Sequence, residues 1–343
     1  MATETPPPGA ASLPENESAT GPIAVDVDER DGDSTFDERI STYTASLTSS
    51  VVDYPTEYGR RYHAFRPGTY YFPNDEDEMN RLDICHAVMV KTIGNRLFLA
   101  PIEEAKTQRI LDIGTGTGIW AMEMGDLFPN AEVLGNDLSA IQPDWVPPNV
   151  KFEIDDVESP WIYNQKFDFI FSRYMNGALA DWPTYIKRVY ENLSPGGWAE
   201  FQDWSFLLSS DDGSIEGSET LRWSHLFLEA AKVYDRESQV GPKLEALVRE
   251  NTGLVNVRHR PYKIPIGPWP KDPRLKDLGM CNLIEMLEGL EGFSFKLLCG
   301  ALGWTKEEVY VLLAGVRKEL KSTKLHAYLK FHVVYGQKPE ESK

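Results

Sequence analysis

The sequence predicts an α/β protein built on a parallel, Rossmann-like sheet. Short apolar runs alternate with amphipathic segments from about residue 107 onward. In the first half the runs recur every ~15–30 residues, a spacing that suits crossover connections between parallel strands. A glycine-rich turn follows the first of these runs, within residues 109–121. We therefore expect a single sheet that binds its ligand at the carboxyl ends of the strands.

The predicted domain follows an N-terminal tail and a cover. Residues 1–50 contain ten acids and two arginines, and the chain as a whole has a net charge of −18. The first 37 residues are poor in aromatic residues and rich in Pro, Ser, Glu, Asp and Ala, which predicts a disordered acidic tail. Cover helices are expected within 38–106, including one capped by Asn74 or Asp75. The domain itself is expected over 107–343.

The expected elements of this domain fall into two halves. In the first half we expect strands at 109–113, 132–136, 150–154, 167–171 and 198–203, and helices at 119–128 and 185–193. The second half is rich in helix, which suggests a substrate-lid insert over about 207–325. A strand at 255–262 and a closing strand at 326–336 complete the prediction.

Composition excludes several functional classes. The acidic balance argues against nucleic acid, whose binding depends on clusters of Lys and Arg. No apolar run approaches the ~20 residues of a membrane span, and the N-terminus lacks the features of a signal peptide. Cys85, Cys281 and Cys299 have neither metal-ligand nor redox spacing. They predict reduced, buried thiols and a cytoplasmic protein, whose oligomeric state has no signature here.

The glycine turn indicates the kind of ligand. Asp112 ends the first strand, and Gly114, Gly116 and Gly118 follow it. The dinucleotide fingerprint requires a third glycine where this chain has Ile119, and no Gly-Lys-Ser/Thr sequence follows to form a phosphate loop. A carboxylate beside bare backbone suits a cationic ligand, which predicts S-adenosylmethionine as the cofactor.

Acids after the second and third strands extend this site. Asp137, followed by Leu138, is placed to accept the two ribose hydroxyls, although it could instead cap a helix. Asp156 is the candidate for the adenine amine, with the backbone of Val157 at the ring edge. Asp155 competes with Asp156 for that role, and one of the two is expected to stabilise a turn.

The remaining candidates concern the reacting end of the site. After the fourth strand, a side chain or carbonyl is expected to face the methyl donor, and the candidates are Arg173, Tyr174 and Asn176. No Asn-Pro-Pro-Tyr sequence is present to hold an amide or a nucleobase amine as acceptor. His63 and His225 are candidate general bases, with tethering of the cover and simple packing or solvation as their respective alternatives. Asp203, ending the fifth strand, could orient the acceptor or stabilise a turn.

Several blocks carry a resemblance to a known family. They are YGRRYHAFRPGTYYFPNDEDEMNRLDICH, ILDIGTGTGIWA, VLGNDLSAIQP, FEIDDVESPW, FDFIFSRYMNGALADW and LSPGGWAEFQD. Over residues 55–205 the chain resembles class I S-adenosylmethionine-dependent methyltransferases, and within them the fungal LaeA-like group. The resemblance implies a seven-stranded sheet with an antiparallel last strand. It also places Arg61, Tyr62 and His63 in a segment that covers the cofactor.

The resemblance leaves more than one function open. LaeA-like proteins include nuclear regulators of secondary metabolism and enzymes that methylate the metabolites. The chain is also similar to indole-alkaloid O-methyltransferases of the roquefortine–oxaline type. Aromatic residues make up 11% of the chain, and it has no basic localisation cluster. We therefore expect an O- (or N-) methyltransferase with a small polycyclic, aromatic acceptor. A regulator, or a cofactor-binding protein that does not methylate, is the alternative.

Overall fold

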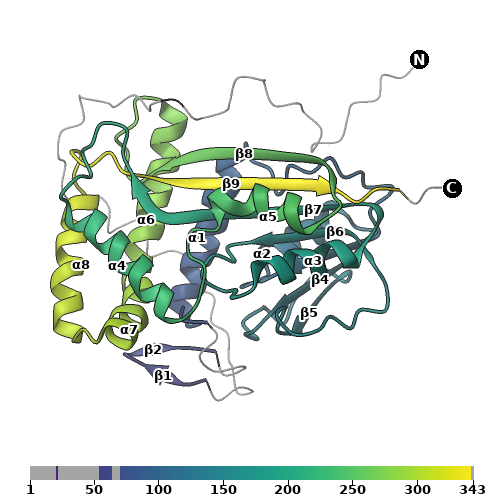
Figure 1. Ribbon diagram of the computed structural model, residues 1–343, viewed down its shortest axis with the longest axis horizontal. Helices are drawn as coiled ribbons and strands as arrows, with labels where there is room; N and C mark the ends of the chain where they lie inside the picture. The colour runs from purple at the N-terminus through teal and green to yellow at the C-terminus, as the bar shows by residue number, and fades with distance from the viewer. Residues whose placement is uncertain (1–20, 22–53, 64–69, 341–343) are drawn as a thin grey trace.

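A seven-stranded sheet organises the molecule. The computed structural model describes residues 21, 54–63 and 70–340 (Figure 1). The strand order is β5-β4-β3-β6-β7-β9-β8. The strands are β3 (Arg109–Ile113), β4 (Glu132–Asp137), β5 (Val150–Ile154), β6 (Phe167–Arg173), β7 (Leu193–Ser209), β8 (Val255–Pro265) and β9 (Tyr328–Gln337).

Strand directions confirm the expected topology. β3 pairs in parallel with β4 and β6, and β5 and β7 extend the parallel sheet on either side. β9 runs antiparallel to both β7 and β8. The last strand of the chain is therefore the antiparallel one, as the resemblance implied.

β7 is much longer than the strand expected at 198–203. Leu193 already pairs with Phe167, so the Pro-Gly-Gly segment lies inside the strand and does not precede it as a turn. At the other end Ser209 still pairs with Tyr328 of β9. β7 therefore extends beyond the parallel part of the sheet and connects it to the helical half of the molecule.

Eight α-helices are found in the described part of the chain. They are α1 (Glu76–Thr92), α2 (Ile119–Leu127), α3 (Trp182–Asn192), α4 (Glu219–Val233), α5 (Leu244–Asn251), α6 (Pro273–Ser294), α7 (Gly300–Leu302) and α8 (Lys306–Leu320). The Asp75 side chain accepts the backbone N–H of Glu78 and so caps α1, one of the two predicted caps.

Alternation along β3 explains how helices cover both faces of the sheet. Ile110 belongs to a buried cluster with Trp120 of α2, whereas Leu111 belongs to another with Tyr185 and Val189 of α3. Successive side chains of a strand point to opposite faces, so a continuous apolar run needs a cover on each. Asp112 lies on the same face as Ile110, the face of α2.

The helical half surrounds the extended ends of β7, β8 and β9. Figure 1 shows α4, α6, α7 and α8 gathered there, with α2 and α3 beside the shorter strands. The expected insert over 207–325 is interrupted by β8, which is an edge strand of the main sheet. Most of its aromatic residues pack in the core. Five are buried, namely Trp223, Phe227, Trp269, Phe293 and Phe295, and Trp304 is half-buried.

The described part of the cover contains one helix and a small ribbon. α1 is preceded by β1 (Thr56–Glu57) and β2 (Arg60–Arg61), which pair antiparallel. The predicted tail, 1–37, lies outside the described residues except for Gly21. All three cysteines are free thiols, but only Cys85 is fully buried. Within the described residues, no helix combines the length and apolarity needed to cross a membrane.

Candidate functional site

A cleft opens where the strand order reverses, between β3 and β6. It is bordered by α1, by the glycine turn after β3 and by the end of β6. Ligands of open α/β sheets bind at such switch points. The lining residues are Leu82, Cys85, His86, Asp112, Gly114, Thr115, Gly116, Thr117, Ile119, Trp120, Phe171, Arg173 and Tyr174.

Glycine is needed at the three positions of the turn for different reasons, although all three residues have positive φ. A Cβ on Gly114 would lie 2.5 Å from Met175 Sδ, and one on Gly118 would lie 2.4 Å from Phe152 Cζ. Gly116 is different, because its Cβ would meet only Leu82, at 3.6 Å. Gly114 and Gly118 are thus required for packing, whereas the backbone at Gly116 is open to a ligand.

Asp112 places a carboxyl group in a poorly solvated part of this cleft. Its side chain is buried and accepts a hydrogen bond of 2.6 Å from the Thr115 hydroxyl. Burial raises the pKa of Asp112 to about 7, opposed by the Thr115 hydrogen bond and the charge of Arg173. A cationic group bound beside Asp112 would restore its ionised form.

Arg173 brings the opposite charge to the same cleft. Its Nη2 lies 2.7 Å from His86 Nδ1, while Nη1 is buried and has no hydrogen-bond partner among the described residues. Together Asp112 and Arg173 give the cleft one group that can be negatively charged and one that is positively charged. This arrangement suits a zwitterionic ligand group.

Asp137 connects the glycine turn to the next strand. Its two carboxylate oxygens accept the backbone N–H groups of Gly116 and Ser139, each at 2.9 Å. Burial raises the pKa of Asp137, although these hydrogen bonds oppose the shift. Leu138, beside it, is half-buried. The expected ribose acid is therefore next to the turn, where its side chain also helps to hold the turn in place.

The two acids after β5 both stabilise the local turn. Asp156 accepts the backbone N–H of Glu158 at 2.9 Å and the Ser159 hydroxyl at 3.0 Å, and Asp155 accepts the backbone N–H of Asp156 at 2.8 Å. The backbone of Asp155 donates to the Asp137 carbonyl at 3.0 Å. Val157 follows and is buried. The structure brings these residues beside Asp137, outside the lining of the cleft described above.

The candidate bases are separated in the structure. His225 is exposed on α4 and does not line the cleft. His63 is buried, with Nε2 3.1 Å from the Tyr70 carbonyl oxygen. Its neighbour Tyr62 is also buried, with Lys296 Nζ 4.1 Å from the ring centroid. Neither His63 nor Tyr62 lines the cleft.

Asp203 supports the turn that follows β6. Its carboxylate accepts the backbone N–H groups of Trp204, Met175 and Asn176. Burial raises the pKa of Asp203 to about 8. The two donors at Met175 and Asn176 directly follow Tyr174, a residue that lines the cleft. Asp203 thus fills the turn-stabilising role that was one of its two predicted alternatives.

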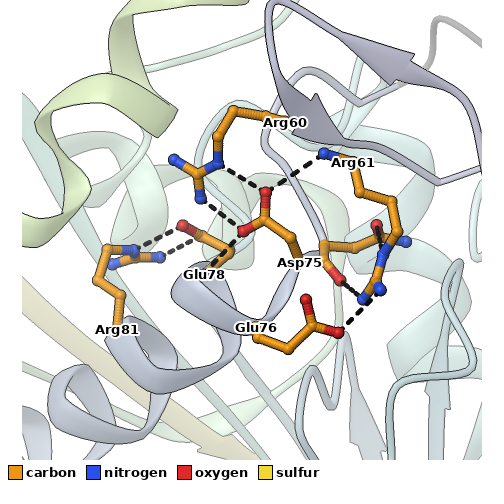
Figure 2. Close-up of polar contacts among 7 residues, drawn as sticks. Arg60, Arg61, Asp75, Glu76, Glu78 and Arg81 are labelled. Atoms are coloured by element: carbon orange, nitrogen blue, oxygen red, sulfur yellow. Dashed lines mark hydrogen bonds and ion pairs between the residues drawn. The ribbon is translucent and has the colours of Figure 1, made fainter. Parts of the chain in front are cut away.

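A polar network holds the cover against the site (Figure 2). Arg60 donates two hydrogen bonds of 2.6 Å to Asp75, and Arg61 donates to Glu76 at 2.9 Å. Arg61 also donates to Asn74, whose amide in turn donates to the Ser139 hydroxyl at 3.2 Å. The ribbon β1–β2 is therefore linked, through Asn74 just before α1, to the segment that follows Asp137.

α1 contributes cleft residues that the sequence did not reveal. Leu82, Cys85 and His86 lie one turn apart on the helix and line the cleft. Their helical spacing predicts a core-facing stripe, so nothing in the sequence distinguishes His86 from a packed residue. Its position opposite Arg173 depends on how α1 packs against the sheet, which no local pattern encodes.

Comparison with known proteins gives consistent matches. A family model described as a methyltransferase domain matches residues 60–259. Methyltransferase pytC of Aspergillus terreus is 45% identical over 296 residues, covering 86% of this chain and 91% of the relative. The secondary metabolism regulator LAE1 of Cochliobolus heterostrophus is 35% identical over 292 residues, covering 83% and 95%. The protein-methionine methyltransferase laeA of Emericella nidulans is 31% identical over 297 residues, covering 86% and 79%.

Proposed function

The chain belongs to the S-adenosylmethionine-dependent methyltransferases, in the fungal LaeA-like group, and we propose that it methylates an oxygen or nitrogen of a small aromatic metabolite. The observation that carries the methyltransferase proposal is that the Asp112 carboxyl and the Arg173 guanidinium both line the cleft beside the glycine turn and interact electrostatically. Arg173 Nη1 is a buried donor in need of an acceptor.

These residues fit the donor. In the proposal Asp112 binds the ammonium and Arg173 the carboxylate of its amino-acid end, with the backbone at Gly114, Gly116 and Gly118 close by. Asp137 with Leu138 receives the ribose, and Asp155, Asp156 and Val157 bind the adenine. Tyr62 belongs to the cover. When bound, S-adenosylmethionine supplies an electrophilic methyl group on a sulfonium.

The acceptor side favours an apolar, aromatic molecule. Tyr174 lines the cleft, and its ring centroid lies 4.4 Å from that of Trp204. Identity is also higher to pytC, at 45%, than to the regulator LAE1, at 35%. We accordingly propose an alkaloid-like acceptor and a cytoplasmic enzyme.

Methyl transfer does not depend strongly on a general base. Positive charge disperses in the transition state, so orientation and exclusion of water supply most of the acceleration, up to ~7–11 kcal/mol in favourable cases. A hydroxyl acceptor would gain ~10²–10⁴-fold from a general base. His63 and Asp203 are the buried candidates for that role, and the exposed His225 is the weakest.

Transfer of a labelled methyl group tests the proposal. The purified protein is incubated with methyl-labelled S-adenosylmethionine and either a panel of phenols, hydroxyindoles, N-hydroxyindoles and amines, or a fungal protein extract. We expect label in a small-molecule product, and about tenfold less with the Asp112→Asn variant when the donor is well below saturation.

The regulator alternative is favoured by the similarity to LAE1 and to the protein-methionine methyltransferase laeA. Label found only in proteins, on methionine, would support that alternative and contradict the small-molecule acceptor. No label in either fraction, despite binding of S-adenosylhomocysteine, would indicate a cofactor-binding protein that does not methylate.

A further inference from the structure

Three side chains from three elements form a connected chain at the edge of the cleft. Glu123 lies in α2, His86 in α1 and Arg173 at the end of β6. Glu123 Oε2 is 3.1 Å from His86 Nε2, and His86 Nδ1 is 2.7 Å from Arg173 Nη2. His86 is 5% exposed, whereas the Glu123 side chain is 47% exposed. These three side chains therefore connect solvent, at Glu123, to the guanidinium of Arg173, whose Nη1 atom is buried.

The chemistry of the partners determines the protonation of His86. A guanidinium offers only donors, so Nδ1 must accept from Arg173 and cannot carry a proton. The single ring proton is then on Nε2 and is donated to Glu123. Burial, together with the charge of Arg173, lowers the pKa of His86, although Glu123 opposes the shift. A neutral His86 imidazole protonated on Nε2 is consistent with the contacts to both Glu123 and Arg173.

The far side of Arg173 points to a ligand. Nη2 is occupied by His86, but Nη1 is buried without an acceptor among the described residues, and the side chain lines the cleft beside Asp112. A rigid guanidinium held through one amino group presents the other in a fixed direction, which favours recognition of a carboxylate.

We propose that His86 and Glu123 are positioning residues that hold Arg173 so that its Nη1 binds the carboxylate of the methyl donor. The inference rests on the proposed function, because it concerns the same donor site. It adds that affinity for the donor's carboxylate depends on two residues that do not themselves contact the donor.

The arrangement makes carboxylate recognition sensitive to acid. The charged groups that face His86 are Glu123 from α2, Arg173 from β6 and Asp83 from α1 itself. As pH falls through the lowered pKa of His86, Nδ1 gains a proton. It then loses its acceptor role and repels Arg173. Binding of the carboxylate should weaken there, whereas binding of a ligand without a carboxylate should not respond to His86.

Calorimetric titration with two ligands tests the proposal. One is S-adenosylhomocysteine, and the other is its decarboxylated analogue, which keeps the adenosine and the amine. We expect His86→Ala and Glu123→Ala to weaken binding of S-adenosylhomocysteine, by about tenfold for His86→Ala, the size of one hydrogen bond to a charged group. The analogue should bind all proteins within about twofold of wild type.

His86→Asn is the matched control, because an Asn side-chain oxygen can replace Nδ1 as acceptor but cannot titrate. This variant should retain most of the affinity for S-adenosylhomocysteine. In wild-type protein, low pH should weaken binding of S-adenosylhomocysteine more than binding of the analogue, and in His86→Asn this difference should disappear. Because Glu123 is half-exposed, its variant keeps the test valid even if His86→Ala fails to fold.

Equal weakening of both ligands would show a merely structural role and overturn the proposal, as would unchanged affinity for S-adenosylhomocysteine in both alanine variants. If wild-type protein binds neither ligand, the proposed function fails and this inference falls with it. If wild-type protein binds S-adenosylhomocysteine but the variants give either of the two contradicting results, only this inference fails and the proposed function stands.

Discussion

The buried carboxyl group of Asp112 lowers the stability of the free protein and favours binding of a cation. Burial raises its pKa to about 7, so the ligand-free protein has to ionise an acid in a poorly solvated place as the pH rises. An ammonium group in the cleft would stabilise the ionised form. The same burial that makes the carboxylate costly in the free protein therefore strengthens its attraction for a cation.

The pH dependence of donor binding follows from this residue. Below pH 7 a proton must leave Asp112 before the ammonium binds, so affinity for S-adenosylhomocysteine should fall by up to about tenfold per pH unit. Asp112→Asn should remove most of this slope and weaken binding at pH 8 by about tenfold or more. Calorimetry between pH 5.5 and 8.5 measures both. A wild-type affinity independent of pH would contradict the assignment.

Asp112→Asn, which should weaken donor binding, should increase the stability of the ligand-free protein. Because the pKa of Asp112 is raised in the folded state, its contribution to stability is present at low pH and is lost as pH rises through about 7. Asp112→Asn should therefore raise the free energy of unfolding at pH 8 more than at pH 6, as measured by urea denaturation without ligand.

Among individual residues, the sequence singled out those at strand ends as site candidates and did not single out the cleft residues on helices. Asp112, Asp137 and Arg173 lie at or next to the carboxyl ends of β3, β4 and β6, and parallel strands bring these ends to one edge. His86 and Glu123 were missed because their significance depends on the relative placement of α1, α2 and β6. A turn role was expected for one of Asp155 and Asp156, and for Asp203 it was one of two alternatives.

Among the elements, α1 connects the cover to the site. Its N-cap, Asp75, also accepts two hydrogen bonds from Arg60 (Figure 2). The preceding residue, Asn74, donates a hydrogen bond to Ser139 beyond β4. The helix then presents His86 to the cleft. Loss of the cap should therefore affect both the stability of the helix and the attachment of the ribbon.

Asp75→Ala measures that connection. It removes the cap and the ion pair with Arg60, and we expect the free energy of unfolding to fall by about 1–3 kcal/mol. Asp77→Ala is the matched control, since Asp77 is an exposed acid in the same first turn. It should change stability by less than about 0.5 kcal/mol. Equal effects in urea denaturation would mean that the cap and its ion pair contribute nothing.

Element boundaries were predictable where the chain has local signals. Asp75 as cap and Pro129 after α2 are such signals. β7 was predicted too short because its outer residues, Trp204 to Ser209, are stabilised by pairing with β9, more than a hundred residues away in the sequence. Strand length of this kind depends on non-local pairing, which a window of sequence does not contain.

For the molecule as a whole, the fold was predictable and the acceptor was not. Alternating strands and helices, together with the glycine turn, indicate the sheet and the donor. The acceptor site depends on how α4, α6 and α8 pack at the extended ends of β7, β8 and β9. Buried aromatic residues look alike in sequence whether they fill a core or line a pocket.

A crystal structure of the protein with S-adenosylhomocysteine tests the proposed donor site most directly. We expect the amino-acid end of the ligand between Asp112 and Arg173, with its carboxylate on Arg173 Nη1 and its ribose at Asp137. A ligand bound elsewhere, or bound in this cleft with its carboxylate away from Arg173, would contradict the donor site described here.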